Sequence, residues 1–148
     1  CNSMTLLDEA GVPIVDDVDG ATAAQRDGEL FLVFNRDGAI YMASPRDATN
    51  AVWDASLIEL GFGTDDPAMT KDGRLLLSVR NDGGADEGLY GQRWDPVEKR
   101  FQTPVHVGNL PYISIEIGID SGGSFELFFS TTTRGVAEPH TTQCTLAL

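Results

Sequence analysis

Apolar residues recur at every second position in three segments of the chain, and each of these segments starts at a glycine. The segments are 28–34 (GELFLVF), 73–79 (GRLLLSV) and 123–129 (GSFELFF). A period of two indicates a β-strand, because successive side chains point to opposite faces of a sheet. The three copies share one apolar register, so we expect three equivalent strands.

Turn residues separate these strands from their neighbours. Asp72-Gly73 predicts a tight turn, since glycine adopts positive φ freely and aspartate tolerates it. The segments 35–38 and 81–84 predict further turns, before strands at 39–43 and 88–90. The strand at 74–79 is apolar at almost every position, which predicts burial on both faces. The stretch 64–90 therefore predicts a complete strand–turn–strand–turn–strand unit.

The spacing of the turn glycines, 45 and then 50 residues, is typical of the blades of a β-propeller. The prediction is a single all-β domain over 1–148, with about three four-stranded blades at 18–60, 61–107 and 108–148. Residues 1–17 are expected to hold a closing strand, within 4–15, that pairs with 141–148 of the last blade. For the segment 53–60, the sequence leaves two alternatives open, a strand and one or two helical turns.

Charge restricts the class of partner. The 148 residues include ten basic and twenty-three acidic side chains, for a formal net charge of −13. Nucleic-acid binding by electrostatics needs clustered Lys and Arg, which the sequence lacks. No apolar run approaches the roughly 20 residues of a membrane-spanning helix.

The acidic side chains are predicted to lie in solvated turns, with calcium binding at 81–87 as the alternative. His106 and His140 lack partners at zinc-ligand spacing, so no cofactor and no metal site are predicted.

The first residue of the sequence is Cys1, which suggests either removal of an upstream segment or a short remnant before Met4. A processed bacterial lipoprotein also starts with cysteine, which would place the protein in the periplasm or among secreted proteins. If the ends of the domain meet, Cys1 and Cys144 are able to form a disulfide. Two unpaired thiols are the equal alternative.

Several short motifs resemble a known family. Asp66-Pro67, Asp72-Gly73, Ser78-x-Arg80 and Leu89-Tyr90 resemble the repeat of TolB-type, WD40-like (PD40) β-propellers. This resemblance implies four-stranded blades around a central channel, usually six of them. The three blades predicted here would then be part of a longer propeller, or half of a six-bladed ring that a homodimer closes.

Two carboxylates occupy matching positions in the repeat. Asp66 and Glu116 each lie seven residues before a turn glycine, where blade one has Ala21. A weaker similarity to five-bladed glycoside hydrolases of the arabinanase and xylosidase kind implies that such acids cleave glycosidic bonds as acid and base. The alternative is structural, since an Asp-Pro pair also caps a turn and fixes the entry into a strand.

The preferred function is a non-catalytic binding or assembly module that recognises a protein, peptide or carbohydrate partner at the mouth of the channel. Glycosidase activity through Asp66 and Glu116 is the alternative. Aromatic side chains are candidates for the binding surface, although packing inside the blades is the competing role for them. These candidates are Tyr41, Trp53, Tyr90, Trp94 and Tyr112.

Overall fold

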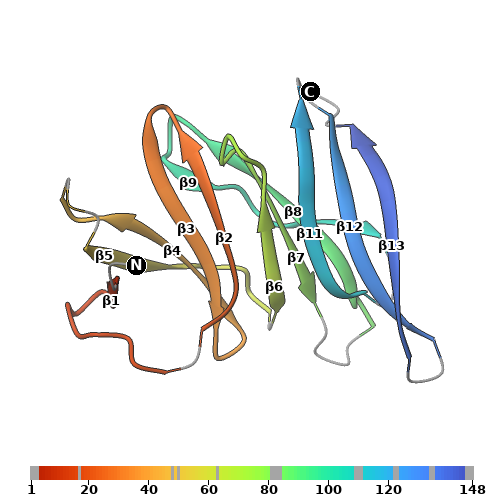
Figure 1. The fold of residues 1–148 in the computed structure, drawn as a ribbon, viewed down its shortest axis with the longest axis horizontal. Helices are drawn as coiled ribbons and strands as arrows, with labels where there is room; N and C mark the ends of the chain where they lie inside the picture. The colour runs from red at the N-terminus through yellow and green to blue at the C-terminus, as the bar shows by residue number, and fades with distance from the viewer. Residues whose placement is uncertain are drawn as a thin grey trace.

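Three β-sheets stand side by side in the computed structural model, and their planes face one another (Figure 1). The structure describes residues 4–16, 18–47, 49, 51–62, 64–80, 85–108, 112–121, 124–133 and 136–145. Those residues contain no helix, and one of the sheets curls into the shape of half a barrel. The all-β prediction is confirmed for this part of the chain.

The first sheet has the strand order β1-β5-β4-β3-β2. Strands β2 to β5 follow one another as an antiparallel meander, and β1 pairs in parallel with β5 at the outer edge. Their bounds are β1 (Thr5–Leu7), β2 (Asp19–Arg26), β3 (Glu29–Arg36), β4 (Ala39–Pro45) and β5 (Val52–Ile58).

The second sheet has the order β10-β8-β7-β6, with β9 also paired to β8, and the third has the order β11-β12-β13. The first strands of the three sheets, β2, β6 and β11, lie next to one another. The bounds are β6 (Asp65–Met69), β7 (Leu75–Arg80), β8 (Gly88–Asp95), β9 (Arg100–Phe101), β10 (Val105–Gly108), β11 (Tyr112–Ser121), β12 (Ser124–Thr133) and β13 (Val136–Thr145).

Two local predictions differ from the structure. The pairing predicted between 4–15 and 141–148 is wrong for the described residues, because β1 pairs with β5 and β13 pairs with β12. The helical alternative for 53–60 is also wrong, since β5 occupies most of that segment. Alternate residues of β5 are buried, including Trp53 and Ala55, and this period of two favours the strand.

The predicted tight turn at Asp72-Gly73 is confirmed, and its hydrogen bonds explain its shape. The Gly73 amide donates to the Thr70 carbonyl over 2.8 Å. The Thr70 hydroxyl lies 2.6 Å from Asp72 Oδ1 and accepts from the Leu75 amide over 3.0 Å. Thr70 is buried at 1% exposure, so the turn satisfies a polar side chain that burial would otherwise penalise.

The core consists of apolar layers between the sheets. Strand β7 is buried on both faces, as predicted. Leu76 packs toward the first sheet, whereas Leu75, Leu77 and Val79 pack toward Leu127 of the third sheet. The opposite face of the first sheet, which carries Phe34, Trp53, Leu32, Tyr41, Ala43 and Ala55, packs against Leu6 and Ile14.

The three repeat strands share one apolar pattern in the sequence, but their aligned side chains do not point to the same side of the sheets. Phe34 faces away from the second sheet and Phe129 faces toward it, whereas the aligned Val79 faces the third sheet. In the second sheet, the chain is therefore shifted by one residue relative to the sequence alignment of the three repeats. A shift of one residue reverses the faces of a strand, and β7 tolerates it because Leu75, Leu76 and Leu77 are apolar at successive positions.

The junction between the first and second sheets centres on Arg26, which is 4% exposed. Its Nη1 donates to the Gly73 carbonyl over 2.7 Å. Its guanidinium lies 3.3 Å from the ring centroid of Trp94 and 4.3 Å from that of Phe31. Burial lowers the pKa of Arg26, which Asp27 partly offsets, yet an arginine stays protonated in proteins. A buried cation thus joins the two sheets.

We expect Arg26→Ala to lower the free energy of unfolding by about 3 kcal/mol, since it removes a charge-assisted hydrogen bond and a desolvated cation–π contact. Urea denaturation measures the change. The control is Arg46→Ala, because the Arg46–Asp54 pair is half exposed and should contribute only about 0–1 kcal/mol. Equal losses in the two variants would contradict the central role of Arg26.

Gly88 marks a close approach of two backbones at the start of β8. Its φ is +145°, and a Cβ at this position would lie 2.1 Å from the Gly108 carbonyl oxygen. We expect Gly88→Ala to cost more than about 3 kcal/mol, because the clash is with backbone. Gly28→Ala is the control, since Gly28 has φ of +89° but open space, and strain alone costs about 1–2 kcal/mol. Thermal unfolding of both variants compares the two costs.

Candidate functional site

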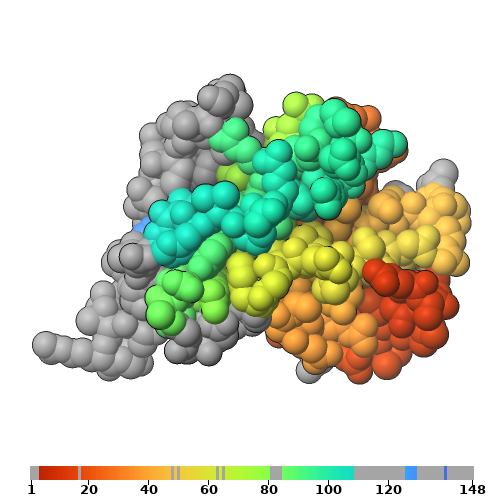
Figure 2. All heavy atoms as spheres, turned by 180° about the vertical axis from the view of Figure 1, so that it is seen from behind, coloured from red at the N-terminus to blue at the C-terminus, as the bar shows by residue number. Residues whose placement is uncertain are grey.

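A groove of about 910 Å³ lies between the outer parts of the first and second sheets. On the face seen in Figure 2, atoms of residues 55–62 (yellow) lie beside those of 95–108 (green to teal). Its volume is within the range of small-ligand sites. The groove is lined by Ala39, Ile40, Met42, Ser56, Leu57, Ile58, Glu59, Leu60, Gly61, Phe62, Trp94, Asp95, Lys99, Arg100, Phe101, Gln102, Thr103 and Pro104.

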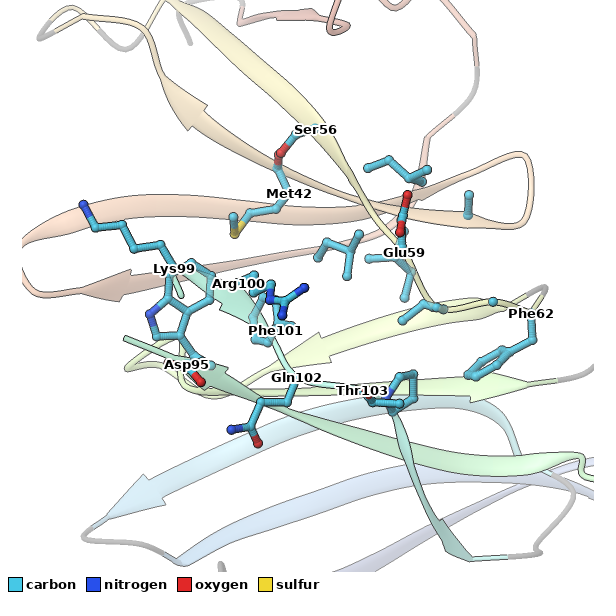
Figure 3. A pocket seen from close by; sticks show the side chains of 18 residues that line it. Met42, Ser56, Glu59, Phe62, Asp95, Lys99, Arg100, Phe101, Gln102 and Thr103 are labelled. Atoms are coloured by element: carbon cyan, nitrogen blue, oxygen red, sulfur yellow. The ribbon is translucent and has the colours of Figure 1, made fainter. Parts of the chain in front are cut away.

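The wall of the first sheet is made by β4, β5 and the linker that follows β5. Met42 and Ser56 are cross-strand partners, so their side chains lie on the same face of the sheet. The linker then carries Glu59 and Phe62 along the groove, with Phe62 at one end of it (Figure 3). This wall combines a thioether, a hydroxyl and a carboxylate.

The wall of the second sheet is aromatic. Trp94 of β8 and Phe101 of β9 are register partners, and their rings meet edge to face with centroids 5.3 Å apart. Arg26 lies against the Trp94 ring at 3.3 Å and so holds the indole in place. Gln102 continues the wall, and its carbonyl accepts from Gln92 Nε2 over 2.9 Å. The Trp94 ring is therefore fixed by Phe101 of the second sheet on one side and by Arg26 of the first sheet on the other.

The turn between β8 and β9 supports this wall through Asp95. Its Oδ1 accepts from the amides of Val97 and Glu98 over 2.9 and 3.1 Å. These backbone hydrogen bonds to the charged carboxylate, the Glu98 amide first, lower the pKa of Asp95. Asp95 is thus occupied within its own turn, which orders the segment that carries Phe101.

The aromatic candidates from the sequence lie in different places. Trp94 lines the groove. Tyr90 is buried, with its ring centroid 4.6 Å from that of Phe62, which does line the groove. Tyr41 and Trp53 lie on the opposite face of the first sheet. Tyr112 belongs to β11, but its side chain lies outside the described part of the structure.

Asp66 and Glu116 belong to β6 and β11, the first strands of two neighbouring sheets. Asp66 sits in a one-residue bulge of β6 with φ of +44°. A Cβ placed on Gly20 would lie 3.2 Å from Asp66 Oδ1, so this oxygen faces β2. Glu116 pairs in register with Phe128 of β12. The side chain of Glu116 itself is not among those described.

Within the described residues, no three His, Cys, Asp or Glu side chains gather closely enough to hold a metal ion. Residues 81–84 of the calcium alternative and Cys1 of the disulfide alternative lie outside the described part. The His106 ring packs against the Tyr90 ring in a tilted arrangement, with ring centroids 5.0 Å apart. No helix among the described residues is long and apolar enough to cross a membrane.

Most of the residues that line the groove were not predicted from the sequence. Phe101 was not among the candidates, and neither were Ser56 and Gln102. A partial signal exists, because Phe101 follows the Asp95-Pro96 turn that starts a new edge segment beside Trp94. No pattern in the sequence indicates that the linker 59–62 crosses to face that turn.

Comparison with known proteins gives no assignment at this point: no protein-family model matches the chain, and a search of curated proteins returns no match.

We expect Asp95→Asn to reduce the acid sensitivity of the fold. A carboxyl group whose pKa is lowered by folding stabilises the protein at pH values above its pKa in the unfolded chain, here 3.8. This stabilisation is lost as the pH falls through the pKa of the group in the folded protein. Below about pH 4, the melting temperature of the wild type should fall more steeply with pH than that of the variant. Glu98→Gln, in the same exposed turn, is the control; identical pH profiles for all three proteins would contradict the prediction.

Proposed function

We propose that the three sheets are consecutive blades of a β-propeller-type module. Two observations support this arrangement: the first strands β2, β6 and β11 lie side by side, and the first two sheets contain four-strand meanders. A one-residue bulge also recurs in β2, between Asp19 and Thr22, and in β6, between Asp65 and Ala68. The TolB-type motifs favour the same proposal.

We further propose that the module is non-catalytic and binds a saccharide chain in the groove. The observation that carries this proposal is the rigid aromatic wall of Trp94 and Phe101 opposite the polar side chains of Ser56 and Glu59. Aromatic rings offer apolar surface to one face of a sugar ring, while hydroxyl, amide and carboxylate groups form hydrogen bonds with its hydroxyls. The open shape of the groove suits a chain rather than an enclosed small molecule.

Binding without turnover is the function that the described carboxylates favour. Acid–base cleavage of a glycosidic bond needs two carboxyl groups on either side of the bond, at most about 9.5 Å apart. Of the two carboxylates that line the groove, Asp95 and Glu59, Asp95 already accepts two amide hydrogen bonds within its own turn, which favours a structural role for it over proton transfer. A peptide partner is the competing class, which the following experiment separates.

The chain has two tryptophans, Trp94 in the groove and Trp53 on the opposite face of the first sheet, which allows a direct test. In Trp53→Phe, the fluorescence of Trp94 should change saturably on titration with xylohexaose. In the matched Trp94→Phe protein, which reports only from Trp53, the same titration should give no change. A hexapeptide of alanine and serine serves as the competing probe.

Phe101→Ala should weaken xylohexaose binding about tenfold, the loss expected for one aromatic contact of about 1.4 kcal/mol. The control is Val97→Ala, because Val97 is 84% exposed in the nearby turn and does not line the groove. A response to the peptide alone would overturn the saccharide proposal. No response to either probe would overturn the groove as the binding site.

A further inference from the structure

Two cations line the groove, and in the described part of the chain no acidic group pairs with either of them. The side chains of Lys99 and Arg100 are exposed there and have no hydrogen bond or ion pair within that part. Acids are plentiful in this chain, and most arginines find one. The arginines with an ion pair among the described residues are Arg36, Arg46, Arg74 and Arg80.

The cross-strand partner of Arg100 is an acid that is already engaged. Asp95 of β8 and Arg100 of β9 are register partners, and opposite charges at such positions ordinarily attract each other. The Asp95 carboxylate instead accepts from the two amides of its own turn. The donors of the Arg100 guanidinium are therefore available to a ligand.

Lys99 occupies a backbone conformation that suits other residue types better. Its φ is +51°, in the left-handed region. Every other described residue with positive φ is a glycine or an aspartate, and both types tolerate this region better than lysine does. A lysine is thus held where glycine would relieve strain, which points to a use for its ammonium group.

The two cations stand beside the aromatic wall, across the groove from Met42 and Ser56 (Figure 3). They directly precede Phe101 in the chain, so one short segment contributes a ring and two positive charges to the same wall. A sugar ring on that wall would place its substituents close to both cations. The charged acceptor that matches them is a carboxylate.

We propose that the saccharide bound in the groove is acidic, and that Arg100 and Lys99 bind its carboxylate. This inference rests on the proposed function, because it takes saccharide binding in the groove as given. A guanidinium forms paired hydrogen bonds with a carboxylate, and an ammonium adds a compact charge. Glu59 on the opposite wall repels an anion and so directs the carboxylate toward β9.

The overall charge of the chain makes the sign of the effect decisive. With a formal net charge of −13, the field of the whole protein disfavours an anionic ligand. Charges separated by more than about 10 Å are largely screened at about 0.1 M salt, whereas contacts inside the groove are not. Tighter binding of an acidic ligand therefore requires cations in the groove itself.

The test is isothermal titration calorimetry of the wild type with two ligands that differ in one group. One is xylopentaose with a glucuronic acid branch, and the other is the same oligosaccharide with its carboxylate reduced to an alcohol. At about 0.1 M salt the acidic form should bind about fivefold tighter, the gain expected of an exposed charge pair. At about 1 M salt the two ligands should bind alike, because the Debye length is then about 3 Å.

Variants assign the preference to the two cations. Arg100→Gln combined with Lys99→Gln should abolish it. Lys71→Gln is the matched control, because Lys71 also has no ion pair among the described residues but does not line the groove. That control should keep the fivefold preference.

Lys99→Gly gives a second readout that needs no ligand. Relief of the left-handed strain should raise the melting temperature by about 3 °C, while the preference for the acidic ligand falls. A stabilised Lys99→Gly protein that keeps the full preference would overturn the role of Lys99.

The outcomes separate this inference from the proposed function. If the wild type binds the reduced oligosaccharide but binds the acidic form no more tightly, the inference is overturned and saccharide binding stands. If neither form binds and xylohexaose does not bind either, the proposed function is overturned together with the inference. An equal loss of preference in Lys71→Gln would assign the effect to overall charge and would also overturn the inference.

Discussion

The strand β7 is buried on both faces, and this constraint determines how the rest of the chain is arranged. Its residues Leu75 to Val79 are all buried, so the second sheet requires a cover on each side. The first sheet supplies one cover and the third sheet the other. A sheet that covers a neighbour with one face must then protect its opposite face, and the first sheet does so with residues 4–16.

Polar groups in the junction set how the first two sheets meet. Arg26 bonds to the Gly73 carbonyl. Asn35 Nδ2 donates to the Thr64 carbonyl over 2.5 Å, and the Thr64 hydroxyl donates to the Val79 carbonyl over 2.7 Å. A buried polar group without a partner is costly, so these bonds select one relative position of the sheets. The sheets are thereby joined near β2 and β6, while the groove lies between their outer strands.

Local patterns predicted the strands and turns well, because periodicity and turn residues act over a few positions. The Asp72-Gly73 turn and the double burial of β7 are examples. The face that each strand presents was not predictable from the same pattern. A segment apolar at successive positions, such as Leu75 to Leu77, fits a sheet in either orientation, and the neighbouring sheets decide which one is adopted.

Asp66 and Glu116 show that aligned residues need not share a local geometry. Both precede a turn glycine by seven residues, yet Asp66 lies in a bulge of β6 whereas Glu116 pairs in register with Phe128. The groove residues show the converse, since Met42 and Phe101 are far apart in the repeat and meet only because two sheets join at their first strands. Sites in stacked sheets are therefore determined by the junctions, which no single repeat encodes.

The two ends of the stack differ in how they are covered. At the first sheet, Phe34 is fully buried beneath residues 4–16. At the third sheet, Phe128 alternates with the inward-facing Leu127 and is 41% exposed. An exposed apolar side chain favours contact with another surface, whereas a buried one does not. In the described part of the chain, the two ends of the stack are therefore not equivalent.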